Sequence, residues 1–188
     1  MKRFLLTILS LAALAAPAAA QQTFKPEVGQ AGKDVVWVPT SPELVEKMLD
    51  MAKVTATDIV MDLGSGDGRM VIAAAKRGAR AIGVEFNPDM VELSRRSAAE
   101  AGVADRATFI QGDMYEADVS KATVLALFLL PSNLEKLEPK FRALAPGTRI
   151  VVNTFGVPGW KAEVTETISG ECTSWCTAIL YNLPPKTQ

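Results

Sequence analysis

The stretch from Ile59 to Arg69 constrains the fold more than any other part of the chain. A short apolar run over residues 59–63 predicts a buried strand, and residues 70–76 predict a helix. Three alternating glycines, Gly64, Gly66 and Gly68, lie between them. A strand, a glycine-rich turn and a helix in this order bring the backbone close to a nucleotide-like ligand. The spacing is not the Gly-x-Gly-x-x-Gly of dinucleotide-binding proteins, so a dinucleotide oxidoreductase is the less favoured interpretation.

The rest of the chain alternates between strands and helices. Further strands are expected at residues 81–85, 107–110, 124–130 and 149–154, each separated from the next by a helical segment or a turn. This pattern predicts an α/β fold: a Rossmann-like, doubly wound, mostly parallel seven-stranded sheet. The last two strands, expected within residues 162–168 and 175–183, form a C-terminal antiparallel hairpin. We expect one domain over residues 35–188, preceded by a loose polar lead-in over residues 21–34.

The amino terminus has the three regions of a secretory signal peptide. Residues 1–3 are basic, residues 4–16 are apolar, and residues 17–20 are small with an Ala-x-Ala pattern. We therefore expect cleavage after Ala20 and export, most simply to a bacterial periplasm, with no membrane span after cleavage. An inefficient leader would leave the protein in the cytoplasm.

Composition excludes several kinds of chemistry. Hydrophobic residues make up 48% of the chain and charged residues 22%, as in a packed globular protein. There is no histidine and there are two cysteines, which excludes a Ser-His-Asp triad and disfavours a metal site. The net charge of −1 gives no electrostatic argument for nucleic acid, so a protein or small-molecule substrate is favoured.

Acidic residues are expected at the carboxyl ends of three neighbouring strands, where ligands bind in a doubly wound sheet. Asp62 precedes the glycine turn, Glu85 can accept hydrogen bonds from both hydroxyls of a ribose, and Asp113 can accept one from an adenine amino group. Met114 can pack on the adenine ring. Each acid taken alone could instead be a solvated or capping carboxylate. The turn itself adds Ser65, and Asp67 to Arg69 begin a helix whose free amides favour partial negative charge, such as that of a ligand carboxylate.

Apolar residues at the end of the fourth strand border the expected reactive centre. Leu130 and Pro131 are the candidates to line the substrate side. Trp37 and Trp160 could line it as well, but we expect both in the core.

These motifs resemble the class I S-adenosylmethionine-dependent methyltransferases over nearly all of residues 35–183. Within that class the chain is similar to the small protein-lysine methyltransferases that modify the adenine nucleotide translocase or the ATP synthase c subunit. The residues that carry this similarity are Val38-Pro39-Thr40, residues 64–69 and 71–76, Glu85-Phe86-Asn87-Pro88 and Ser94-Arg95.

The resemblance implies S-adenosylmethionine as cofactor and methyl transfer to a nucleophile, for which a protein lysine is the candidate. It implies that the cofactor binds to the residues Asp62, Gly64, Ser65, Gly66, Asp67, Gly68, Glu85, Phe86, Asp113 and Met114. It also places Thr40 near the methyl donor, because the Val-Pro-Thr segment lies over the cofactor in that group. The leader motivates a second hypothesis, an exported non-catalytic protein that binds a nucleoside or a partner.

Cys172 and Cys176 allow two interpretations. Export permits a disulfide, and an i, i+4 pair can be bridged across a tight turn. Two buried free thiols fit the sequence equally well.

Overall fold

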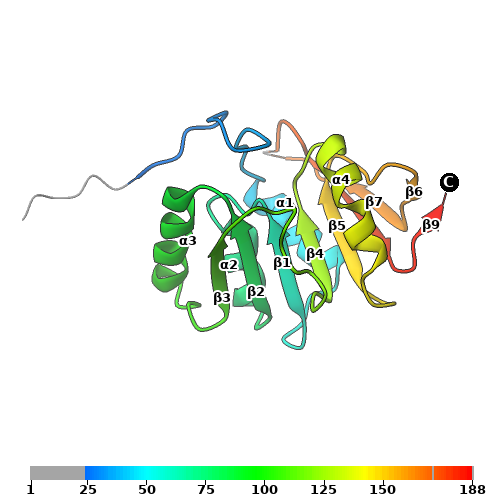
Figure 1. Cartoon of the computed structure of the whole chain (residues 1–188), viewed down its shortest axis with the longest axis horizontal. Helices are drawn as coiled ribbons and strands as arrows, with labels where there is room; N and C mark the ends of the chain where they lie inside the picture. Colours follow the sequence, from blue (N-terminus) through cyan, green and yellow to red (C-terminus); the bar gives the residue numbers. More distant parts are fainter. Residues whose placement is uncertain (1–23, 171, 188) are drawn as a thin grey trace, which may run out of the picture.

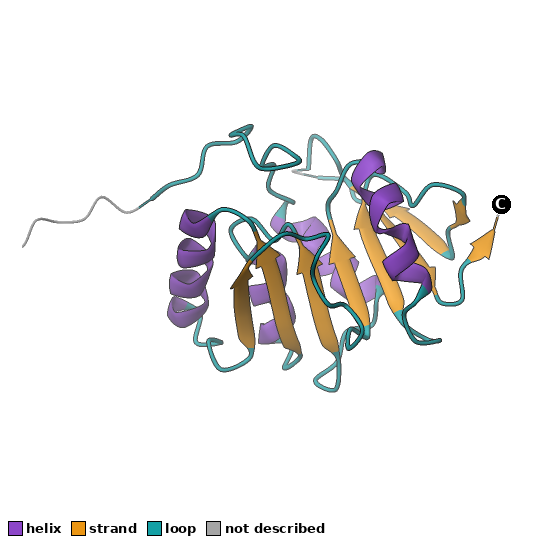
Figure 2. Ribbon diagram, in the orientation of Figure 1, coloured by secondary structure: helices purple, strands orange, loops and turns teal. Residues whose placement is uncertain are grey.

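The computed structural model describes residues 24–170 and 172–187, so the expected leader lies outside the described residues. Figures 1 and 2 show a central sheet with helices packed against it. The helices are α1 (Pro42–Met51), α2 (Arg69–Lys76), α3 (Pro88–Glu100) and α4 (Pro131–Arg142). The strands are β1 (Ile59–Leu63), β2 (Arg80–Glu85), β3 (Ala107–Gln111), β4 (Val124–Leu127), β5 (Arg149–Asn153), β6 (Trp160–Lys161), β7 (Val164–Thr167), β8 (Thr177–Asn182) and β9 (Lys186–Thr187). In the described part of the chain, no helix is both long and apolar enough to cross a membrane.

Seven of the strands form one sheet in the order β3-β2-β1-β4-β5-β8-β7. The pairs from β3 across to β5 are parallel, and β8 runs antiparallel to both β5 and β7. This confirms the predicted mostly parallel sheet with an antiparallel C-terminal hairpin. The short β6 and β9 pair apart from this sheet and were not predicted.

The fourth strand is shorter than expected. It ends at Leu127 rather than at residue 130, because Leu130 is the extended residue that precedes Pro131 at the start of α4. Other helix starts follow the signals in the sequence. The side chain of Ser41 accepts a hydrogen bond from Leu44 N at 3.3 Å, and that of Asn87 accepts one from Asp89 N at 2.9 Å.

Strand alternation divides the core into two layers. In β1, Val60 faces the layer that contains α1, α2 and α3, whereas Met61 and Leu63 face the layer that contains α4. Both faces of the sheet are therefore covered, as a parallel sheet requires. Asp62 is on the same side as Val60, and it is the one carboxyl group in the buried part of β1.

A buried ion pair and its hydrogen bonds connect the beginnings of the parallel strands β1, β4 and β5. Asp58 is 6% exposed and precedes β1, and its carboxylate accepts hydrogen bonds from Thr123 Oγ1 at 2.7 Å and Thr55 N at 2.8 Å. Arg149, the first residue of β5, completes the pair. Burial alone would raise the pKa of Asp58, but the hydrogen bonds and the charge of Arg149 outweigh it and lower that pKa.

We expect Asp58→Ala to lower the free energy of unfolding by about 3 kcal/mol, because it leaves the guanidinium of Arg149 without its carboxylate partner. Urea unfolding measures this, with the exposed Asp105→Ala as the control that changes little. Since the folded-state pKa is below the ordinary 3.8, the stabilisation is present above that pH and is lost as the pH falls below it. A destabilisation of less than about 0.5 kcal/mol, typical of an ordinary surface substitution, would contradict this account of the network.

Candidate functional site

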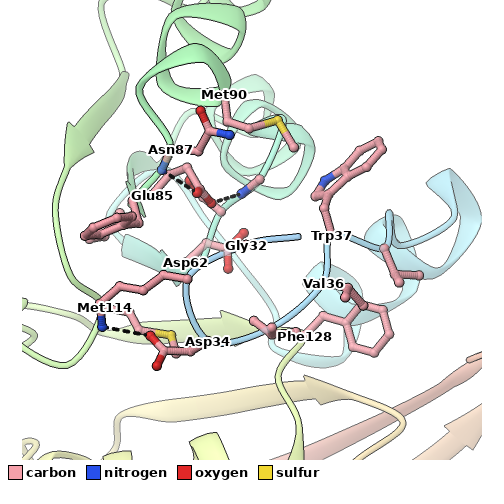
Figure 3. Close-up of a pocket in the computed structure, with 18 of the residues that line it drawn as sticks. Gly32, Asp34, Val36, Trp37, Asp62, Glu85, Asn87, Met90, Met114 and Phe128 are labelled. Carbon is pink, nitrogen blue, oxygen red and sulfur yellow. Dashed lines mark hydrogen bonds and ion pairs between the residues drawn. The ribbon is translucent and has the colours of Figure 1, made fainter. Parts of the chain in front are cut away.

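A pocket opens at the carboxyl ends of β1, β2 and β4, where the sheet order reverses. A doubly wound sheet binds its ligands at this position. The floor and one wall come from the glycine turn and the strand ends, and the residues of this part are Asp62, Gly64, Ser65, Gly66, Val84, Glu85, Ala126 and Leu127. Residues 30–40 form the opposite wall, and Figure 3 shows this segment passing across the pocket.

Glu85 ends β2 with its carboxylate oriented by two backbone donors. Oε2 accepts a hydrogen bond from Gly66 N and Oε1 accepts one from Asn87 N, both at 2.9 Å (Figure 3). A carboxylate has about four lone-pair positions, so two acceptor positions remain for other donors. The glycine turn and the start of α3 therefore fix a side chain that can still accept the two hydroxyls of a ribose.

Asp113 has a similar arrangement after β3. Its Oδ1 accepts a hydrogen bond from Tyr115 N at 2.9 Å, and its Oδ2 pairs with Lys33 Nζ at 3.0 Å. Lys33 also pairs with Asp34 at 3.0 Å and lies 5.6 Å from the centroid of the Phe86 ring. The backbone hydrogen bond from Tyr115 and the pairing with Lys33 lower the pKa of Asp113, so this group is an ionised acceptor.

Asp62 has the opposite electrostatic environment. It is 7% exposed, and burial, with a smaller contribution from the charges of Glu85 and Asp67, raises its pKa to about 8. At neutral pH the carboxyl is therefore largely protonated. A cationic group placed in the pocket would favour its ionisation.

Close packing, as well as room for a ligand, requires glycine at two positions of the turn. Gly66 has a φ of +54°, and a Cβ on it would lie 2.6 Å from Nε1 of Trp37. Gly68 has a φ of +79°, and a Cβ there would lie 2.7 Å from the ring of Phe109. Only glycine lets the turn adopt this backbone and make these close contacts.

We use the term N-terminal strap for residues 29–40, in which backbone hydrogen bonds close a loop between Gly29 and Trp37. Gly29 N donates to Trp37 O at 2.8 Å, and Trp37 N donates to Gln30 O at 2.9 Å. At its far end, Arg69 Nη1 donates to Thr40 O at 2.7 Å while the same guanidinium pairs with Asp67. The buried Thr40 hydroxyl also accepts a hydrogen bond from Asn153 Nδ2 at 3.2 Å.

Arg69→Ala removes the link between the glycine turn and the N-terminal strap. We expect it to weaken S-adenosylhomocysteine binding about tenfold, because the strap wall is less well ordered, with little change in thermal stability. Calorimetric titration measures the affinity. Lys76→Ala, at the exposed end of the same helix, is the matched control, and equal affinities for the two variants would contradict the anchoring role of Arg69.

The structure gathers most of the predicted site residues around one pocket, and leaves others outside its walls. The predicted residues that line it are Thr40, Asp62, Gly64, Ser65, Gly66, Glu85, Phe86, Asp113 and Met114. Asp67 and Gly68 do not line the pocket. Asp67 pairs with Arg69, and Gly68 packs against the ring of Phe109. Leu130 and Pro131 also lie outside the lining, since they begin α4, and Phe128 takes that place.

The structure differs from expectation at Trp37 and adds Lys33 to the site. Trp160 is 2% exposed in the core as expected, but Trp37 lines the pocket, because the N-terminal strap turns its indole toward Gly66. Lys33 was not predicted at all. No periodicity or motif marks it, and its partner Asp113 is 80 residues away.

The residues present fit an S-adenosylmethionine molecule. Two orientated carboxylates have acceptor positions left for ribose hydroxyls and an adenine amino group, and Met114 and Phe86 provide apolar surface beside them. When bound, this cofactor supplies an electrophilic methyl group. The residues of the chain then hold and orient it.

Fold and pocket together define a class I S-adenosylmethionine-dependent methyltransferase. The sequence model described as the ANTKMT methyltransferase domain matches residues 62–164, and the chain belongs to that family. S-adenosylmethionine is the cofactor of this enzyme class. The relatives are named as enzymes, which does not support the non-catalytic alternative.

Individual relatives are also named as methyltransferases. A protein-lysine N-methyltransferase of Saccharolobus islandicus (strain REY15A) is 43% identical over 132 residues, covering 69% of this chain and 82% of that protein. The adenine nucleotide translocase lysine N-methyltransferase of Mus musculus is 37% identical over 68% of this chain, which spans only 56% of its length. The crystal structure of an RNA methyltransferase from Salinibacter ruber with S-adenosyl-L-homocysteine has a TM-score of 0.73 and 46% identity, covering 78% of this chain and 94% of that one.

Proposed function

We propose that this chain methylates lysine side chains of proteins. The observation that carries the proposal is the 43% identity, over 82% of its length, to an enzyme named as a protein-lysine N-methyltransferase. The Salinibacter ruber structure, named as an RNA methyltransferase, is the competing comparison. Charge favours protein over RNA, because the chain has 20 basic and 21 acidic residues and loses Lys2 and Arg3 if the leader is cleaved.

The pocket supports an amine acceptor. A lysine amine must lose its proton before its lone pair can accept a methyl group, and apolar surroundings favour the neutral amine. Val36, Leu127 and Phe128 provide such surroundings on one side of the pocket. The absence of histidine is compatible with this chemistry, since water can take the proton and orientation supplies much of the rate.

Labelled methyl transfer to proteins of a cell extract tests the proposal. We expect the wild-type chain to label extract proteins from tritiated S-adenosylmethionine, and prior acetylation of their lysines to abolish the label. Ribonuclease treatment of the extract should leave it unchanged. Label that survives acetylation, or that disappears with ribonuclease, would contradict a lysine acceptor.

We also propose that the chain acts outside the cytoplasm. The basic, apolar and small-residue regions of residues 1–20 support this proposal, and the Cys172–Cys176 disulfide of the structure suits an oxidising compartment. Fractionation of a bacterial host followed by amino-terminal sequencing tests it. We expect a periplasmic chain that begins at Gln21; a chain that begins at Met1 in the cytoplasm would contradict it.

A further inference from the structure

Three aromatic side chains extend one wall of the pocket toward the surface. We call Phe128, Phe155 and Trp175 the aromatic cluster. Phe128 and Phe155 have ring centroids 6.4 Å apart at an interplanar angle of 18°, and Phe128 and Trp175 have centroids 6.3 Å apart at 54°. Phe128 lines the pocket itself, so the cluster is continuous with it.

The topology places this cluster on the side away from the groups expected to bind the ribose and adenine. Phe128 follows β4 and Phe155 follows β5, two neighbouring parallel strands that end at the same edge of the sheet. In Figure 3, Phe128 lies with Val36 on the opposite side of the pocket from Glu85 and Asn87. Val36 is itself 51% exposed, so this side is both apolar and open to an incoming group.

Trp175 is held in place by local covalent structure. It is 45% exposed and lies in the turn between β7 and β8, which the Cys172–Cys176 disulfide closes with a Cα–Cα distance of 5.8 Å. Its φ of +56° is a backbone conformation that bulky residues rarely adopt. Ile168 N also donates to Cys176 O at 2.9 Å, which joins the two ends of the turn. Strained backbone of this kind is concentrated at functional sites, and tryptophan is enriched among the residues that dominate binding.

We propose that the aromatic cluster is the acceptor slot of the enzyme, and that Trp175 determines its affinity for the acceptor lysine. This inference rests on the proposed lysine methyltransferase function. A lysine side chain has an apolar four-carbon stem and a polar amine. Aromatic rings can pack on the stem, and the same apolar surroundings favour the neutral amine that accepts the methyl group. The disulfide is then a positioning element that keeps Trp175 against Phe128.

Steady-state kinetics with the extract proteins as acceptor tests the slot. We expect Trp175→Ala to raise the apparent KM for acceptor about tenfold while the Kd for S-adenosylhomocysteine changes less than about twofold. Trp175→Phe should recover most of the loss, because a ring remains. The Cys172→Ser, Cys176→Ser double variant should behave like Trp175→Ala. The matched control is Ile110→Ala, which removes an apolar side chain of similar exposure on β3, at the far edge of the sheet.

The outcomes separate this inference from the proposed function. If the wild type labels lysines and Trp175→Ala keeps the wild-type KM, the slot is wrong while the function stands. A Trp175→Ala variant that loses affinity for S-adenosylhomocysteine to the same extent would also overturn the slot. If the wild type binds S-adenosylhomocysteine but labels RNA instead of lysine, the proposed function and the slot both fail.

Discussion

Glu85→Ala is expected to weaken the binding of S-adenosylhomocysteine by about a hundredfold. The variant removes a carboxyl acceptor for two ribose hydroxyls, each such hydrogen bond contributing about 1.5 kcal/mol or more. It also leaves the N–H groups of Gly66 and Asn87 without their partner, which loosens the glycine turn. Isothermal titration calorimetry measures the change.

Two controls make this result specific. Glu100→Ala removes an exposed glutamate at the end of α3 and should bind like the wild type. Glu85→Gln should also bind S-adenosylhomocysteine more weakly than the wild type. An amide has one acceptor oxygen, whereas the N–H groups of Gly66 and Asn87 each need an acceptor. Wild-type affinity in a folded Glu85→Ala variant would remove Glu85 from the cofactor site.

The second large effect is a pH dependence of cofactor binding that Asp62 controls. The pKa of Asp62 is raised to about 8 by burial, so the free protein carries a proton there at about pH 6. We expect the ammonium group of bound S-adenosylhomocysteine to lie near Asp62, where its charge favours the carboxylate, so that binding releases that proton. We expect affinity to rise with pH by up to about tenfold per unit between about pH 6 and about 8 and to level above that value.

Asp62→Asn removes the titrating group and isolates its contribution. The variant should bind S-adenosylhomocysteine more weakly than the wild type near pH 8, with little pH dependence between about 6 and about 8. Titrations in buffers of different ionisation enthalpy report proton release directly. A wild-type affinity that is constant with pH, or an Asp62→Asn variant with the wild-type profile, would contradict the role of Asp62.

Much of the site could be predicted because local sequence and sheet geometry determine it. The alternating glycines define the turn after β1, and parallel strands end at one edge, so Glu85 and Asp113 had to lie near that turn. The helix starts at Ser41 and Asn87 follow from their capping side chains. Strand alternation likewise required Asp62 to face a buried layer.

The rest of the site depends on contacts between distant segments whose sequences contain no recognisable motif or periodicity. Lys33 reaches Asp113 from a polar loop, and Trp37 lies over Gly66 because a glycine at that distant position leaves space for its indole. The disulfide was undecided because the spacing of its cysteines allows it only in a tight turn, and the left-handed backbone at Trp175 provides that turn. Phe128 was expected in a strand, and its place in the pocket follows from the early end of β4.

A crystal structure of the chain with bound S-adenosylhomocysteine tests the central claim most directly. The claim is that the pocket between the N-terminal strap and the strand ends holds the cofactor and leaves its reactive end facing Phe128. The account predicts the ribose hydroxyls on Glu85, the adenine amino group on Asp113 and the sulfur on the Phe128 side. A ligand bound in another cavity, or in this pocket with the adenine beside Phe128, would contradict it.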